Sequence, residues 1–159
     1  MRRGVMAERH IDELLEGQPG VKTQVYVNYR GVVGYLDLLI DGNVVEIKSK
    51  GHDKYKSLKD AQRAHIFQAC LYALALEKNE FGVLYIDADT YDTKLFTYET
   101  SKWAPLVNKI IDNFDAAKET FEKTNIVPGF IGLERNHNVD IWNNYPQYAQ
   151  YTEPFYLLQ

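Results

Sequence analysis

The chain has 159 residues, the size of one domain, and its hydrophobic (45%) and charged (25%) contents indicate a folded globular protein and argue against wholesale disorder. A net charge of −4 excludes a global basic field, so any contact with an anionic partner must come from a local patch. The single cysteine, Cys70, excludes an internal disulfide and metal centres built on four cysteines. With no membrane-spanning apolar run and no signal peptide, we expect an intracellular, cytoplasmic protein formed by one domain over residues 1–159.

The first predicted element is an amphipathic helix over residues 2–16, which ends at Gly17. At 100° per residue, Glu8 and His10 lie on opposite edges of its apolar stripe. Either side chain could therefore point into a cleft. The alternative is that both are boundary residues half in solvent, which is the more common case.

Alternating apolar residues predict a strand over residues 22–29 and a turn at Arg30-Gly31 into a second strand, residues 32–40. A two-residue turn there places Tyr26 opposite Tyr35. By the same count, Gln24 lies opposite Asp37. A third strand follows to about residue 49, so we expect a three-stranded antiparallel meander.

The strongest local signal is Asp41-Gly42, typical of a two-residue type I′ turn between the second and third strands. This turn places Asp37 opposite Glu46, with Lys48 on the same face. Opposed carboxylates, with Cβ atoms about 4.5–5.5 Å apart, repel each other and favour a hard divalent cation such as Mg²⁺ between them. The Lys48 ammonium could hold a water or a phosphate nearby. The hairpin alone is equally consistent with a solvent-exposed face.

The one concentrated basic segment covers residues 48–65, directly after Glu46. Cations interleaved with aromatic rings suit phosphate contacts and base stacking, which predicts a nucleic-acid interface. The alternative is a solvated loop and helix start, which is the usual meaning of a charge run. The candidate nucleic-acid-binding residues are Lys50, Lys54, Lys56, Arg63 and His65.

A long helix is predicted over residues 58–78, with Ser57 as its N-cap. Gln68 and Tyr72 share a face of this largely apolar helix with His65, and polar groups that are buried need partners. Alternatively, the two side chains could hydrogen-bond each other and have a purely structural role.

The remaining predicted elements are strands over residues 81–87 and 94–99 and a helix over residues 102–123, capped by Ser101. Residues 125–159 are rich in aromatic side chains and predict an irregular arm that wraps the domain, stacks bases or binds a partner. The order of elements predicts an α+β fold of the sandwich-like kind. In it, a central mixed sheet that contains the meander is flanked by helices.

Three motifs in this order resemble the PD-(D/E)XK nuclease superfamily, especially its RecB-type and lambda-exonuclease-like branches. They are Gly34-x-x-Asp37, then Glu46-Ile47-Lys48, then Gln68-x-x-x-Tyr72, and the resemblance covers residues 3–87. It implies a restriction-endonuclease-like core and a catalytic group made of Asp37, Glu46, Lys48, Gln68 and Tyr72.

In such a family member, Asp37, Glu46 and the Ile47 carbonyl would bind the metal, and Lys48 would orient or deprotonate the attacking water. A helix before the meander offers a third ligand through Gly-x-x-x-Glu, which Gly4 to Glu8 matches, so the resemblance favours Glu8 over His10. Gln68 and Tyr72 would support the site or touch nucleic acid.

The resemblance implies a nuclease dependent on Mg²⁺ or Mn²⁺ that acts on single-stranded DNA or on DNA ends as an exonuclease. The alternatives are an endonuclease on the same scaffold and a catalytically inactive nucleic-acid-binding module. A homo-oligomer that encloses the DNA would suit processive degradation. So compact a version would also suit a viral or phage protein acting in a host cell.

Overall fold

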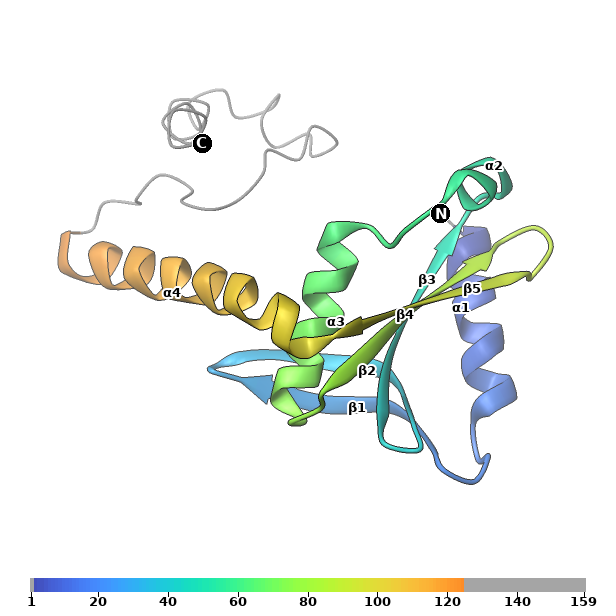
Figure 1. Cartoon of the computed structure of the whole chain (residues 1–159), viewed down its shortest axis with the longest axis horizontal. Helices are drawn as coiled ribbons and strands as arrows, with labels where there is room; N and C mark the ends of the chain where they lie inside the picture. The colour runs from blue at the N-terminus through green and yellow to red at the C-terminus, as the bar shows by residue number, and fades with distance from the viewer. Residues whose placement is uncertain (1, 125–159) are drawn as a thin grey trace. The chain divides into compact units, whose positions relative to one another are not determined.

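The computed structural model describes residues 2–124, so the predicted arm over residues 125–159 lies outside the described part. Its elements in chain order are α1 (Arg2–Leu15), β1 (Val21–Tyr29), β2 (Val32–Ile40), β3 (Asn43–Lys50), α2 (His52–Ser57), α3 (Arg63–Ala75), β4 (Glu80–Asp87), β5 (Thr93–Glu99) and α4 (Thr100–Thr124) (Figure 1). The chain divides into two compact units, Met1–Val107 and Asn108–Gln159. The first unit holds all five strands. The expectation of one domain stays a prediction.

The five strands form one mixed sheet in the order β1-β2-β3-β4-β5, in which only β3 and β4 run parallel. The crossover between these two strands contains α2 and α3. Strands β1, β2 and β3 form the antiparallel meander, which confirms the predicted α+β fold with a mixed sheet. In Figure 1, α1 and α3 lie on opposite sides of β3 and β4.

Both predicted hairpin turns have left-handed backbone at their two central residues, as a type I′ turn requires. The φ angles are 49° and 81° at Asp41-Gly42 and 52° and 82° at Arg30-Gly31. Near the turns, the register is the predicted one, with the pairs Ile40 and Asn43, Leu39 and Val44, Leu38 and Val45, and Tyr26 and Tyr35.

The pairing of β2 with β3 stops at Leu38 and Val45, whereas β2 stays paired with β1 as far as Val32. In Figure 1 the β1–β2 ribbon accordingly runs across the line of β3 and β4. Gln24 faces Asp37 by count but is unpaired, with a φ of 50°. Asp37 and Glu46, which were predicted to face each other, therefore do not form a pair in the sheet, because β2 and β3 separate at this point.

The prediction of one helix over residues 58–78 with Ser57 as its N-cap is wrong. Residues 52–57 form α2, Ser57 ends that helix, and α3 begins after Gln62. The cause is the Lys94 ammonium of β5, which donates to the carbonyls of Tyr55 (2.8 Å), Lys56 (3.4 Å) and Leu58 (3.3 Å) and so satisfies the C-terminal end of α2. The Ser57 hydroxyl donates to the Lys54 carbonyl at 3.1 Å, inside this turn.

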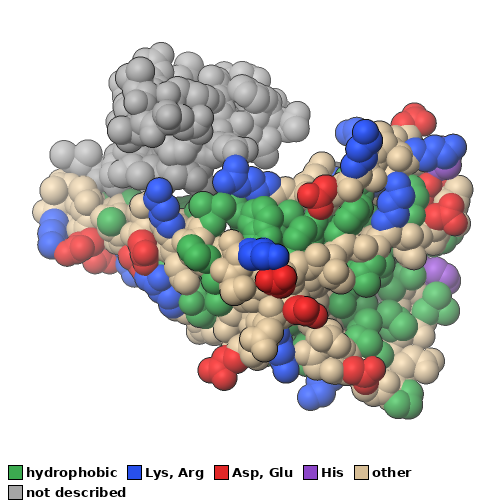
Figure 2. All heavy atoms as spheres, viewed as in Figure 1, with side chains coloured by type: hydrophobic (Ala, Val, Ile, Leu, Met, Phe, Trp, Pro, Cys, Tyr) green, Lys and Arg blue, Asp and Glu red, His purple; other side chains and the backbone are tan. Residues whose placement is uncertain are grey.

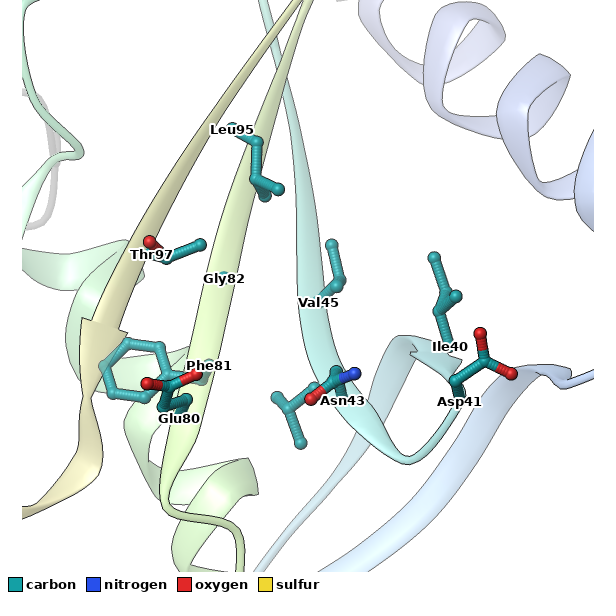
Figure 3. A pocket seen from close by; sticks show the side chains of 10 residues that line it. Ile40, Asp41, Asn43, Val45, Glu80, Phe81, Gly82, Leu95 and Thr97 are labelled. Carbon is teal, nitrogen blue, oxygen red and sulfur yellow. The ribbon is translucent and has the colours of Figure 1, made fainter.

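Helix α4 starts at Thr100, so the predicted cap Ser101 lies inside it. Among residues 2–124, no helix is both long and apolar enough to cross a membrane. A cavity of about 370 Å³ opens beside the β2–β3 turn, with side chains from β2, β3, β4 and β5 around it (Figure 3). Its lining includes Ile40, Val45 and Leu95 but none of the predicted site residues.

Candidate functional site

The edge of β3 that β2 leaves uncovered is closed by two carboxylates. Asp37 Oδ2 accepts the Ile47 N–H at 2.8 Å. Glu8 Oε1, from α1, accepts both the N–H and the hydroxyl of Ser49 at 2.8 Å. These oxygens replace the strand carbonyls that would otherwise pair with β3, because backbone N–H groups away from water need acceptors. Two acidic residues distant in sequence are thereby brought to one strand edge.

Glu46 lies on β3 next to this edge and is 1% exposed. The Lys48 ammonium donates to its Oε1 at 2.5 Å. Its Oε2 is buried and has no hydrogen-bond partner within the described part of the chain. Burial, followed by the negative charge of Asp37, raises the pKa of Glu46 to about 7. A buried carboxylate with one unsatisfied oxygen is costly unless a proton or a cation binds it.

Burial and neighbouring charges also shift the pKa values of Asp37 and Lys48 in the same cluster. Burial raises the pKa of Asp37 in spite of the Ile47 N–H and the charge of Lys48, and the charge of Glu8 adds to the rise. Burial alone would lower the pKa of Lys48, but the charge of Glu46 and its hydrogen bond outweigh burial and raise this pKa. Lys48 therefore stays protonated beside a group of carboxylates.

Helix α3 places Tyr72 against this cluster. Gln68 Nε2 donates to the Tyr72 hydroxyl at 3.1 Å, and Tyr72 is 7% exposed. Burial raises the pKa of Tyr72, and the charges of Glu46 and Asp37 add to the rise. A Cβ atom at Gly34 would lie 2.8 Å from the Tyr72 hydroxyl, so a larger residue there would have to displace the Tyr72 ring. The glycine of Gly34-x-x-Asp37 thus makes room for the tyrosine.

Two of the predicted nucleic-acid-binding residues lie close to Lys48. Lys50 Nζ donates to Gln62 Oε1 at 2.9 Å. His65 Nδ1 is 2.6 Å from the Tyr85 hydroxyl, and burial, followed by the charges of Lys50 and Lys48, lowers the pKa of His65 to about 4.

The other three predicted nucleic-acid-binding residues are exposed. Lys54 and Lys56 lie on α2, and Arg63 begins α3, where its guanidinium lies over the Phe67 ring. Figure 2 shows lysine and arginine side chains gathered with acidic ones over α2, at the upper right. His10, the alternative to Glu8, packs instead against Tyr91 with ring centroids 5.3 Å apart.

Three partners in and near this site were not identified from the sequence. Ser49 binds Glu8, and Tyr85 binds His65. Asp87 is fully buried and bonds His52 Nδ1 at 2.6 Å and the Asp89 N–H at 3.0 Å. Burial alone would raise the pKa of Asp87, but these hydrogen bonds outweigh burial and lower this pKa to about 2. An acidic residue at the end of the apolar run from Phe81 is the one signal that could have revealed it.

Within residues 2–124, no three histidine, cysteine, aspartate or glutamate side chains are arranged closely enough to hold a metal ion as they stand. Glu8, Asp37 and Glu46 each have one oxygen bonded to a protein donor. The donor type nevertheless fits a hard divalent cation, because the available ligands are carboxylate oxygens and one of them, Glu46 Oε2, is buried and has no partner in the part of the chain that the structure describes.

No family model and no curated protein matches the chain. Among solved structures, it is similar to an alkaline exonuclease (LHK-Exo) from Laribacter hongkongensis, with a TM-score of 0.54 and 14% identity over 79% of this chain and 73% of the other. The structure of SSO0001 matches 76% of this chain with a TM-score of 0.44 and 20% identity. The chain spans 58% of the length of SSO0001. The fold therefore resembles that of an alkaline exonuclease.

Proposed function

We propose that this chain is a metal-dependent nuclease that hydrolyses DNA phosphodiester bonds and belongs to the PD-(D/E)XK superfamily. The observation that carries the proposal is the cluster of Asp37, Glu46 and Lys48 where β2 separates from β3. Its buried carboxylate has an oxygen without a hydrogen-bond partner among the described residues, and its ammonium stays protonated. The likeness of the fold to an alkaline exonuclease supports the same proposal.

Asp37 and Glu46 would hold Mg²⁺ or Mn²⁺, with Glu8 as the third carboxylate. In a strand, the N–H and C=O of one residue point to the same side. The Ile47 N–H points to the edge that Asp37 occupies, so the Ile47 carbonyl is available there as an oxygen ligand. The bound metal supplies polarisation of the scissile phosphate and a water of lowered pKa.

Lys48 would orient the attacking water and stabilise the negative charge that develops on the phosphate oxygens. Its ammonium is anchored by Glu46 and its side chain is 23% exposed, so part of the side chain can reach a substrate. A fixed cation beside the reacting phosphate lowers the barrier because it needs no reorganisation during the reaction. This role requires the protonated form, which the surrounding carboxylates favour.

Gln68 and Tyr72 would keep the acidic cluster in place, since their hydrogen-bonded pair lies against it and fills the space left by Gly34. Lys50, Lys54, Lys56, Arg63 and His65 would contact DNA phosphates along α2 and the start of α3. Such contacts provide affinity without sequence preference. A preference for DNA ends is the finer part of the proposal and follows the exonuclease activity named for LHK-Exo, whereas a preference for single strands stays a prediction. A homo-oligomer that encloses the DNA stays a prediction.

The test is incubation of the purified protein with labelled linear and circular DNA, each single- and double-stranded, in Mg²⁺, Mn²⁺ or EDTA. We expect metal-dependent degradation of linear DNA that EDTA abolishes. Cleavage of circular single strands would refute strict end dependence and favour the endonuclease. DNA binding without cleavage in either metal would refute the catalytic proposal and leave the inactive binding module.

A further inference from the structure

Tyr85 and His65 form a hydrogen-bonded pair beside Lys48 and Lys50. Tyr85 lies on β4, directly paired with Lys48 of β3, and is fully buried. Its hydroxyl oxygen accepts the Gln62 N–H at 2.9 Å and lies 2.6 Å from His65 Nδ1. The Lys50 ammonium lies 5.8 Å from the centroid of the Tyr85 ring.

The hydrogen-bond pattern around Tyr85 indicates which nitrogen of His65 carries the proton. The Tyr85 hydroxyl receives a hydrogen from Gln62, so its own hydrogen needs an acceptor, and His65 Nδ1 is the acceptor in reach within residues 2–124. An Nδ1 that accepts a hydrogen bond is unprotonated, and a neutral imidazole then carries its hydrogen on Nε2. The lysines nearby and the burial of the ring oppose a second proton.

His65 shares the face of α3 with Gln68 and Tyr72, since the three are spaced by three and four residues. The ring is half-buried, and its Nε2 has no hydrogen-bond partner in the described part of the chain. A donor N–H without a partner in the described part of the chain, on a ring that feels the charges of Lys50 and Lys48, suits an anionic oxygen. Because the ring is neutral, it adds a directed hydrogen bond without adding repulsion between cations.

We propose that His65 donates a hydrogen bond from Nε2 to a non-bridging oxygen of a DNA phosphate bound beside Lys48 and Lys50. Tyr85 is the positioning residue that holds the ring in this tautomer. The inference rests on the proposed function. It extends that function by making His65 a neutral hydrogen-bond donor and Tyr85 the residue that controls its tautomer.

The first test is the tautomer, read from long-range ¹⁵N–¹H NMR correlations of the metal-free full chain labelled at histidine. We expect His65 at neutral pH to be neutral with hydrogen on Nε2. In Tyr85→Phe, we expect the population of the minor Nδ1–H tautomer to rise toward that of free histidine, which itself prefers hydrogen on Nε2, while circular dichroism stays unchanged. A wild-type ring protonated on Nδ1 would overturn the inference, whether or not the variant folds.

The second test is binding of a fluorescent single-stranded oligonucleotide in EDTA, measured by anisotropy. The amide nitrogen of glutamine reaches close to the position of Nε2, whereas that of asparagine does not. We expect His65→Asn to weaken binding about tenfold, the size of one hydrogen bond to a charged acceptor. We expect the matched variant His65→Gln to stay within about threefold of wild type, because it keeps the donor.

Equal binding by wild type and His65→Asn, or no binding by the wild type, would overturn the inference. Wild-type protein that shows the expected tautomer and the expected order of binding but cleaves nothing would support the inference and refute the nuclease. The two proposals can therefore fail separately.

Discussion

Replacement of Glu46 by glutamine should stabilise the metal-free protein more at pH 8 than at pH 5. Burial and the charge of Asp37 raise the pKa of Glu46 from 4.5 to about 7. The folded state then keeps a proton that the unfolded chain releases, so its stability is full below pH 4.5 and is lost as pH rises through 7. At about 1.4 kcal/mol per pH unit, the full loss is roughly 3 kcal/mol.

His65 has the opposite effect in an overlapping range. Its pKa falls from 6.5 to about 4, because burial and two lysines disfavour the charged ring. The stability contributed by the neutral ring is full above pH 6.5 and is lost as pH falls toward 4, by an amount that solvent screening of the half-buried ring reduces. In wild type, the two effects oppose each other between pH 4.5 and 6.5, so a pH profile of wild type alone would not separate them.

The assay is urea unfolding in EDTA at pH 5 and pH 8. The gain in the free energy of unfolding on Glu46→Gln should be larger at pH 8 by about 2–3 kcal/mol. The matched control is Glu99→Gln, whose side chain is 53% exposed and which should show the same small change at both pH values. An equal gain from Glu46→Gln at pH 5 and pH 8 would refute the assignment of a buried, strained carboxylate.

Three further predictions concern the metal, the packing of α3 and the end of α2. Millimolar Mg²⁺ or Mn²⁺ should raise the melting temperature of wild type but not of Asp37→Asn, because it relieves repulsion between carboxylates; no shift in wild type by scanning fluorimetry would contradict a metal site. Gly34→Ala should lower the free energy of unfolding in urea by about 1–3 kcal/mol, since the new Cβ would lie 2.8 Å from the Tyr72 hydroxyl, and an unchanged free energy would contradict this close packing. Lys94→Met should lower stability by about 1–2 kcal/mol and speed amide hydrogen exchange in α2, and unchanged exchange would refute the capping role.

The turn chemistry made the meander predictable from sequence. Asp41-Gly42 determines the register of its hairpin, and that register places Asp37 near Glu46 and Lys48. The separation of β2 from β3 was not predictable: the residues of β2 before Leu38 pair only with β1, and this depends on the path of the β1–β2 hairpin and not on any local residue preference. The consequence is that Asp37 bonds the Ile47 N–H in place of a strand neighbour.

Long-range partners account for the rest of what the sequence did not show. Ser57 has the character of an N-cap, but the Lys94 ammonium, distant in sequence, makes it the last residue of α2. The bond from Ser49 to Glu8 joins residues 41 positions apart. No periodicity in the sequence marks such a pair. The prediction that Glu8 belongs to the site therefore depended on the family resemblance and not on the helical pattern.

The most direct measurement of the central proposal is the single-turnover rate of DNA hydrolysis in Mg²⁺ for wild type, Lys48→Ala and the control Lys22→Ala, a replacement of an exposed lysine of β1. We expect wild type and Lys22→Ala to cleave at similar rates and Lys48→Ala to lose cleavage while circular dichroism stays unchanged. Undiminished cleavage by Lys48→Ala, or cleavage by wild type that persists in EDTA, would contradict a metal-dependent site built on Asp37, Glu46 and Lys48.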